Sequence, residues 1–421
     1  MRKIIIIVVA LLVALFTRAE QKMTLQECID MALENNRNIK QRELERKTKE
    51  IAYKQARLNL LPDLNGSASQ SWSFGRSQIA DGTYQNLNVS SSSYGISTGI
   101  TLFDGLKMKY NIDERMAGLK KSEADLEKIR QDIILNVSTA YLQVLLNKEL
   151  LQVADDQLEL TKNKIEQQQK LVETGKLAEG EMYELYAQQS KEELSKTQAD
   201  NTLKLSLLDL AQIIELSDFE DLDVEVPADL MSNELQLLDA KTVYESAVAH
   251  RPEVKSAEYQ LKGNEKNVQI AKAAFFPTLT FGANVSSGYY NSVATPTSTG
   301  VGFNLSVPIF NKMGTRNQVK TAQLNVESSK LDFENTKIEL RKTIQQAYYN
   351  AIAAKSKWDA AIKSEQANKE AYRFANQKYE GGRATLYELY QAKNNLSTAQ
   401  SDVVQAKYEY IFRLKILELL M

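Results

Sequence analysis

The chain is internally duplicated, and this duplication constrains its fold more than any other feature. Residues 32–64 align without a gap with residues 247–279. Eight of the 33 aligned positions are identical, among them Pro62 and Pro277, where chance would give about two. The tetrapeptide Tyr-Glu-Leu-Tyr also occurs twice, at 183–186 and 387–390. Two copies predict two equivalent structural units.

The composition favours long helices and excludes several classes of function. The 421 residues include only six prolines, and proline breaks helices because it lacks an N–H and clashes with the preceding turn. A net charge of −2 offers no surface for nucleic acid. The single histidine, His250, and the single cysteine, Cys28, have no catalytic or metal-binding partners in the sequence. We therefore expect no enzyme, no metal and no cofactor, with Cys28 a small residue on the first helix and His250 on the surface.

The first residues have the pattern of a secretion signal. Arg2 and Lys3 precede an apolar run over residues 4–16, and Ala19 offers a cleavage point. The run is shorter than the roughly 20 residues that a spanning helix needs. Residues 1–19 are therefore predicted to be a signal peptide, with an uncleaved anchor as the alternative.

The first repeat is predicted over residues 20–216. A helix begins at Thr24, where Glu27 completes a capping box, and stops before Pro62. The apolar period then changes to two, which predicts a β-hairpin over about 63–103 with a loop from Asp81 to Ser92. A long helix over 107–172, a tip over about 174–181 and a second helix over 181–216 complete the repeat.

The second repeat, residues 241–421, has the same order. It contains a β-hairpin over about 278–310 with a loop at 288–300, a long helix over 315–379, a tip at about 381–384 and a helix over 385–420. The narrow apolar stripes of these helices predict coiled-coil hairpins. Residues 217–240 are acidic and contain no basic residue. They lack the glycine and ligand spacing of a calcium loop, so a solvated connector is expected.

The alternating segments predict a membrane role. Each has one apolar face and one face of Ser, Thr, Asn and Gly, and each is near the 9–11 residues of a tilted membrane strand. An open sheet cannot sit in lipid because its edge groups would be unsatisfied, and four strands cannot close a barrel. Three chains would give twelve strands and a lumen, whereas two would give a filled eight-stranded barrel. The predicted fold class is therefore mainly α with a membrane β part. Trp72 and Phe74 would sit in an aromatic girdle, with packing between protomers as the alternative for Trp72.

At this point the chain resembles the TolC family of outer-membrane efflux proteins, over nearly the whole mature chain. The resemblance rests on the order helix, Leu61-Pro62 or Phe276-Pro277, strand pair, Phe-Asp or Phe-Asn (103–104 and 310–311), long helix, glycine, helix. It implies a homotrimeric channel-tunnel in the outer membrane, in contact with its lipid, with a helical α-barrel extending into the periplasm. Such a duct passively conducts substrate delivered by an inner-membrane pump and a periplasmic adaptor, in tripartite efflux or type I secretion.

The resemblance also implies two sets of site residues at the hairpin tips. The adaptor would dock at the two tip turns, which contain Gly175, Lys176, Leu177, Gly381, Gly382, Arg383 and Ala384. The periplasmic entrance would be gated at Glu184, after a three-residue insertion, at Glu388 and at Gln391, which replaces an acidic residue of the family. The tyrosines of the repeated tetrapeptide, Tyr183, Tyr186, Tyr387 and Tyr390, are expected to be packing residues.

One alternative remains open at this stage. A periplasmic structural or adaptor protein, built of coiled coils with small soluble β regions and no pore, would share the helical pattern. The cargo, the class of the pump and the identity of the adaptor have no signal in the sequence.

Overall fold

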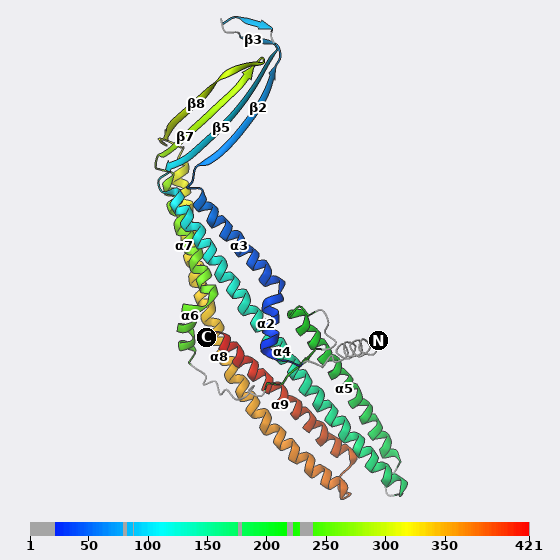
Figure 1. Cartoon of the computed structure of the whole chain (residues 1–421). Coiled ribbons are helices and arrows are strands. Elements are labelled where there is room, and N and C mark those ends of the chain that lie inside the picture. The colour runs from blue at the N-terminus through cyan, green and yellow to red at the C-terminus, as the bar shows by residue number, and fades with distance from the viewer. Residues whose placement is uncertain are drawn as a thin grey trace, which may run out of the picture. The chain divides into compact units, whose positions relative to one another are not determined.

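The computed structural model of the chain describes residues 22–78, 82–86, 88–175, 179–216, 222–227 and 239–420. The predicted signal peptide, Lys176, Leu177 and most of the acidic connector therefore lie outside the described residues. The chain divides into two compact units. The sheet unit comprises residues 42–126 and 252–337, and the hairpin unit comprises residues 1–41, 127–251 and 338–421. Both repeats contribute to each unit (Figure 1).

The sheet unit contains one antiparallel four-stranded sheet in the order β2-β5-β7-β8 (Figure 1). Its strands are β2 (Asp63–Ser73), β5 (Val89–Phe103), β7 (Thr278–Tyr290) and β8 (Val293–Ser306). Pairing of β5 with β7 joins the hairpin of the first repeat to that of the second. The edges of the sheet are therefore β2 and β8, one from each repeat.

Both loops expected between the strands were wrong in part. In the first hairpin, residues 82–86 carry β4 (Tyr84–Asn86), which pairs with β3 (Arg76–Gln78). In the second, the strands run through the expected loop and turn at Asn291 and Ser292, whose φ values are 47° and 69°. Serine and threonine are typical of loops, but here they lie on the extended strands β5 and β8. Asn291 tolerates the left-handed conformation, and its side chain accepts a hydrogen bond from Ser90 N at 2.8 Å.

The helix expected from Thr24 to Leu61 is two helices, α2 (Leu25–Asn35) and α3 (Arg37–Leu58). Asn36 leaves the helical conformation, with ψ at 127°, and its side chain accepts a hydrogen bond from Asn38 N at 2.9 Å, as a residue that caps α3 does. The second repeat breaks at the aligned position, Arg251, between α6 (Ala240–His250) and α7 (Pro252–Ala273). Proline at the first position of α7 favours this start. The predicted capping box of Thr24 and Glu27 is confirmed.

The long helical hairpins are confirmed. Helices α4 (Lys107–Glu173) and α8 (Gly314–Glu380) each contain 67 residues, or roughly 100 Å of helix. Each turns into a second helix, α5 (Gly180–Ile213) or α9 (Leu386–Leu420). No described helix is both long enough and apolar enough to cross a membrane.

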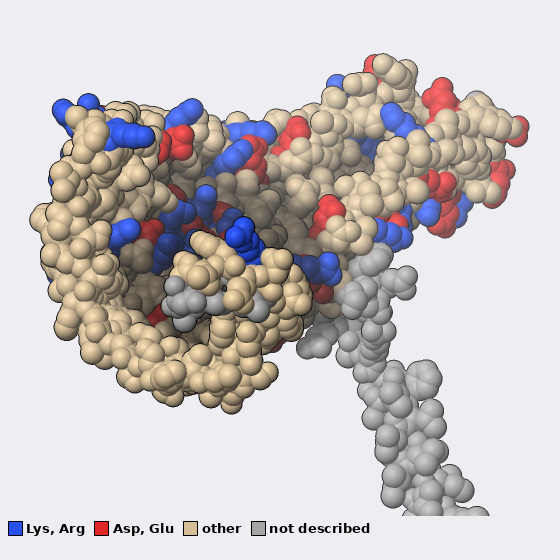
Figure 2. All heavy atoms as spheres, turned by 90° about the horizontal axis from the view of Figure 1, so that it is seen from above, with Lys and Arg blue, Asp and Glu red and all other residues tan. Residues whose placement is uncertain are grey.

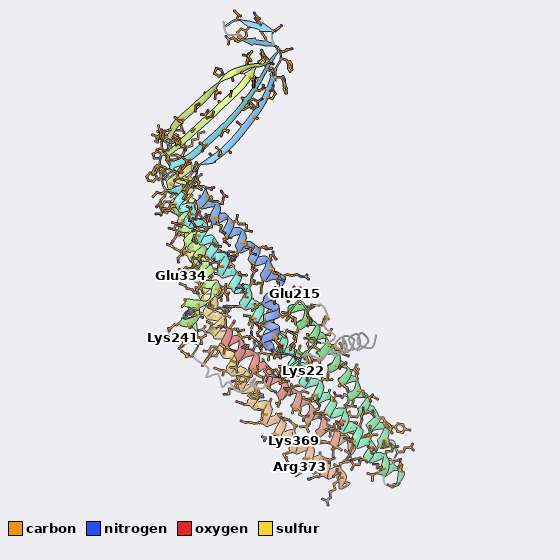
Figure 3. All side chains as sticks on the ribbon, viewed as in Figure 1. Lys22, Glu215, Lys241, Glu334, Lys369 and Arg373 are labelled. Atoms are coloured by element: carbon orange, nitrogen blue, oxygen red, sulfur yellow. The ribbon has the colours of Figure 1, made fainter. Side chains whose placement is uncertain are left out.

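The described part of the acidic connector is structured, so the expectation of a solvated linker is wrong there. Strand β6 (Asp223–Val224) pairs in parallel with β1 (Lys22–Met23). Asp223 Oδ1 lies 2.7 Å from Lys148 Nζ and Asp223 Oδ2 3.9 Å from Lys22 Nζ. Figure 3 labels Lys22 among the helices of the hairpin unit. The fully buried Tyr141 places its hydroxyl between two carbonyl oxygens of the strand pair, those of Met23 and Glu225. Because Lys148 and Tyr141 both belong to α4, these contacts hold the two strands against that helix.

Two residues outside the proposed sites behave as expected. Cys28 is fully buried on α2, and burial, with a smaller effect of the Glu27 charge, raises the pKa of its thiol to about 11. His250 is exposed at the end of α6, where its Nδ1 lies 3.0 Å from Ser246 O.

Candidate functional site

The sheet has one apolar face and one polar face, and strand register keeps them separate across all four strands. In the antiparallel ladder Leu64 pairs with Thr98, Thr98 with Ala283, and Ala283 with Val301. Opposite residues in a ladder share a face, so the apolar side chains of the four strands align. The apolar face comprises Leu64, Tyr94, Ile96, Ile100, Phe281, Val285, Val301 and Phe303. The Phe281 and Phe303 rings lie 5.1 Å apart between centroids.

The opposite face is polar but almost uncharged. Asn65 pairs with Ser97, Ser97 with Asn284, and Asn284 with Gly300. Asp63 is the one charged residue among the four strands, and its carboxylate accepts a hydrogen bond from Gly99 N at 2.7 Å. Figure 2 looks down on this sheet and shows a curved wall with few charged side chains around a hollow. Such a wall offers hydroxyl, amide and backbone groups to water and solutes.

A groove of about 1050 Å³ lies at the helical end of this sheet, within the sheet unit. Gln55 and Asn59 of α3 line it together with Asn284 and Asn304 of the sheet. Leu58, Phe281 and Phe303 line the same groove, so polar and apolar groups are mixed where the sheet meets α3. Trp72, near the end of the β2 ladder, and Phe74, just after β2, were expected in an aromatic girdle, and both are exposed in the single chain.

The repeated Phe-Asp and Phe-Asn dipeptides have a structural role at the strand-to-helix turns. Asp104 Oδ2 accepts a hydrogen bond from Met108 N at 2.9 Å and so caps the start of α4. In the second repeat Asn311 O accepts from Gly314 N at 3.0 Å at the start of α8. Gly105, next to Asp104, has φ of +69°, and a Cβ there would lie 2.7 Å from Phe276 Cβ. The motif is therefore a tight joint between a strand and a helix.

Each hairpin tip begins with a glycine in the left-handed conformation, as expected of a helix C-cap. The φ values are +69° at Gly175 and +67° at Gly382. At the second tip Gly382 N donates to Tyr379 O at 2.9 Å and Arg383 N to Lys378 O at 2.8 Å. This pair of bonds is a Schellman motif. Gly381 and Ala384 flank it, and no atom comes within 4 Å of a Cβ at Gly175 or Gly382.

Of the three predicted gate residues, Glu388 has a structural role that the sequence analysis missed. Glu388 N donates to Thr385 Oγ1 at 3.2 Å, and Thr385 N donates to Glu388 Oε2 at 3.3 Å. These reciprocal bonds form a capping box at the start of α9, and the signal was the Thr-x-x-Glu spacing. Glu184 on α5 and Gln391 on α9 are exposed. Gln391 Nε2 donates to Asn395 Oδ1 at 3.5 Å.

The two hairpins meet near their tips through an apolar cluster and one polar contact. Met182 and Leu185 of α5 pack with Leu386 and Leu389 of α9. Beside them Tyr379 Oη donates to Glu181 Oε2 at 3.0 Å, and burial, followed by this contact, raises the pKa of Tyr379. Glu181 was not predicted as a site residue. It follows Gly175 by the same six positions that separate Glu388 from Gly382, so alignment of the tips without an insertion would have selected it.

The expectation that the repeated tyrosines pack was wrong for three of the four in the single chain. Tyr183 and Tyr387 are 67% and 72% exposed, and Tyr186 is 44% exposed. Tyr390 alone of the four packs against the apolar cluster. The helical period places the first tyrosine of each tetrapeptide on the side away from the cluster.

The fold and the two-faced sheet define a class: a protein of long helical hairpins whose small sheet has an apolar face suited to lipid and a polar face suited to water. Comparison with known proteins is consistent with this. The family model for outer membrane efflux proteins matches residues 28–214 and 243–421. The chain therefore belongs to the outer membrane efflux protein family.

Individual relatives cover most of the chain. Outer membrane protein TolC of Escherichia coli is 23% identical over 98% of this chain and 84% of its own length. Toxin and drug export protein A of Aggregatibacter actinomycetemcomitans is 23% identical over 92% of this chain and 83% of its own. The solved structure of the Campylobacter jejuni CmeC outer membrane channel superposes with a TM-score of 0.81, at 21% identity, over 94% of this chain and 85% of that one.

Family membership confirms the function and location predicted from the sequence. The chain is an outer-membrane efflux channel of a tripartite export system, with a helical extension in the periplasm. Members of the family are transporters and catalyse no reaction. The family implies a trimeric channel. This favours the channel over the alternative of a periplasmic structural protein without a pore.

Proposed function

We propose that three copies of this chain close one duct, each donating its four strands to a twelve-stranded barrel and its helical hairpins to a periplasmic tunnel. The observation that supports this is that the sheet has an apolar and a polar face, and that the outer sides of both edge strands are unpaired in the described part of the single chain. Edge strands present unpaired N–H and C=O groups, which lipid cannot satisfy. Strands β2 and β8 run in opposite directions in the sheet. The β8 edge of one copy can therefore pair antiparallel with the β2 edge of the next.

Helices that adjoin the two edge strands carry matching apolar stripes. Helix α3, before β2, exposes Leu44, Ile51 and Leu58, and α8, after β8, exposes Leu324, Leu331 and Ile338. Each stripe has a spacing of seven residues, which is the period of a coiled-coil seam. The helices run in opposite directions because one enters the sheet and the other leaves it. The stripes thus support a head-to-tail interface that continues the strand pairing and closes a ring.

The size of the ring follows from what the duct must contain. Eight strands would give an interior filled by side chains, whereas twelve leave a lumen. Small residues such as Ser97, Gly282 and Gly300 on the polar face leave that lumen open. Its lack of charge offers little selectivity. We therefore assign selection of the cargo to an inner-membrane pump, which delivers it through a periplasmic adaptor, and passive conduction to this chain.

The hairpin tips are the proposed contact with the adaptor and the proposed gate. Docking would use both tip turns, which contain Gly175, Lys176, Leu177, Gly381, Gly382, Arg383 and Ala384. The exposure of Gly175 and Gly382, with open space around each Cα, supports a docking role. Glu184, Glu388 and Gln391 would line the entrance of the trimer.

The test is assembly of seam variants in outer membranes. Ile51→Glu should reduce the fraction of protein that is extracted as trimers in mild detergent, trimers that SDS then dissociates. The reason is that each apolar side chain of the stripe contributes about 1–2 kcal/mol when it is buried between copies. Lys49→Glu, two residues away and off the stripe, is the matched control and should assemble normally. A wild-type product that is a water-soluble monomer, or an Ile51→Glu variant that assembles as well as the control, contradicts the proposal.

A further inference from the structure

The hairpin unit contains an ion pair buried between its two hairpins. Lys393 Nζ on α9 lies 2.8 Å from Glu192 Oε1 on α5. The two residues are only 4% and 9% exposed. The same ammonium donates to Gln157 O on α4 at 2.9 Å and to Thr161 Oγ1 on α4. Three helices, two from one hairpin and one from the other, therefore converge on one charged group.

The surrounding contacts extend this cluster along the seam between the hairpins. Gln188 Nε2 on α5 donates to Glu192 Oε1 at 2.7 Å and lies 3.4 Å from Asn394 Oδ1 on α9. Toward the other end, Gln157 Nε2 donates to Gln400 Oε1 on α9 at 2.9 Å. Among the described residues, Glu192 Oε2 has no hydrogen-bond partner although it is buried. Among the described ion pairs between the two hairpins, this one alone has both side chains almost fully buried; the side chains of Lys407 and Glu149, another such pair, are 27% and 32% exposed.

Stability alone does not account for this arrangement. An ammonium has three N–H donors, and all three have acceptors here. Removing each ion from water costs several kcal/mol, which a buried pair recovers only in part. Burial accordingly lowers the pKa of Lys393, and the Glu192 carboxylate opposes the shift. Apolar residues of similar volume would stabilise a seam at least as well, whereas a buried polar pair specifies register.

The contact with Gln157 O makes the cluster sensitive to sliding. A backbone oxygen cannot follow its partner by changing rotamer, and a slip of one helical turn would move it about 5.4 Å. Such a slip would leave the ammonium of Lys393 buried without Glu192. Lys393 is eleven residues beyond Gly382, or roughly 16 Å along the helix, so it is close enough to the tip to control where the tips lie.

The duplication does not account for the pair. Aligning the two Tyr-Glu-Leu-Tyr words places Gln189 opposite Lys393 and Leu396 opposite Glu192. Gln189 Nε2 donates within its own helix, to Glu193 at 2.8 Å, and Leu396 is buried. The ion pair therefore has no counterpart at the aligned positions. It joins a residue of the first repeat to a residue of the second.

We propose that Lys393 is a positioning residue: with Glu192 it locks the axial register of α9 against α4 and α5, and so sets the resting aperture of the periplasmic entrance. This inference rests on the proposed function. Opening must either carry the cluster as a rigid body or break the ion pair. Loss of the pair should therefore change conductance without a matching loss of stability.

The test compares purified trimers in planar lipid bilayers, with 1 M KCl as the only probe. The double variant Lys393→Met/Glu192→Leu removes the pair without leaving a lone buried charge. We expect its single-channel conductance or open probability to rise by about twofold or more, while its thermal midpoint stays at or above that of the wild type. The matched control is Lys196→Met, which breaks an exposed pair between α5 and α4, Lys196 Nζ to Asp155 Oδ1 at 2.6 Å. The control should conduct like the wild type.

Two outcomes overturn the inference. One is wild-type conductance and open probability in the double variant, and the other is an equal rise in the Lys196→Met control. If the double variant does not assemble, Glu192→Gln retains an acceptor for Lys393 but removes the charge. A rise in its conductance then supports the lock, and an unchanged record contradicts it. Failure of the wild type itself to form channels would contradict the proposed duct instead.

Discussion

The joint between strand β5 and helix α4 should tolerate no side chain at Gly105. A Cβ at this position would lie 2.7 Å from Phe276 Cβ and 2.8 Å from Ala273 O, well inside normal contact. Its φ of +69° adds about 1–2 kcal/mol for any residue other than glycine. Overpacking typically costs a further 1–3 kcal/mol or so. We therefore expect Gly105→Ala to destabilise the protein by about 2–5 kcal/mol.

Gly118 offers a control with the opposite sign. It lies inside α4, thirteen residues further on, with no positive φ and no atom within 4 Å of an added Cβ. Alanine in a helix interior is more favourable than glycine by about 0.5–1 kcal/mol, so Gly118→Ala should be neutral or stabilising. Both variants are compared by thermal and urea unfolding of detergent-solubilised protein, followed by the helical circular dichroism signal. Equal stability of the two variants would refute the reasoning about the joint.

Three further predictions concern Cys28 and the second tip. Because the pKa of Cys28 is raised to about 11, folding disfavours its thiolate. Its contribution to stability should therefore be constant below about pH 9 and fall by roughly 2–3 kcal/mol as the pH rises to 11. The free energy of unfolding of Cys28→Ala, measured beside that of the wild type, checks this, and parallel pH profiles would contradict it. Glu388→Gln keeps the capping box but removes the charge, so it should leave the thermal midpoint unchanged and reduce block of the channel by divalent cations. Glu388→Ala should cost about 0.5–1 kcal/mol, and an unaltered block in both variants would exclude a gating role. Gly382→Trp should lower export in cells while trimers still form, since no atom lies within 4 Å of its Cβ and its positive φ costs only about 1–2 kcal/mol. Normal export at normal expression would argue against docking there.

The strands were predictable because apolar and polar residues alternate along them one by one. The alternation of Ile96, Thr98 and Ile100 with Ser97 and Gly99 states which side chains share a face, whatever the strand pairs with. Where both faces are polar, as at 288–300, the same reasoning gave a loop in place of a strand. Alternation without apolar residues carries no signal, although the backbone pairs equally well.

Other features depend on contacts that no local pattern contains. The break at Asn36 follows from one side chain that bonds to Asn38 N, and asparagine is common enough in helices that the residue alone does not predict it. The pairing of β5 with β7 joins segments about 190 residues apart. The ion pair of Lys393 and Glu192 crosses 201 residues. On a helical wheel both residues would have been placed on solvated faces, because charge is normally exposed.

Where the two repeats differ in structure, the trimer should depart from six-fold symmetry. Three copies of two equivalent units would give a ring with nearly six-fold symmetry, and the sheet and the break at Asn36 and Arg251 respect it. The tips do not. The second tip has a Schellman turn followed by the capping box of Glu388, whereas α5 begins with no side-chain cap. An N-terminus without a cap frays more readily. The first turn of α5 should therefore fray before that of α9.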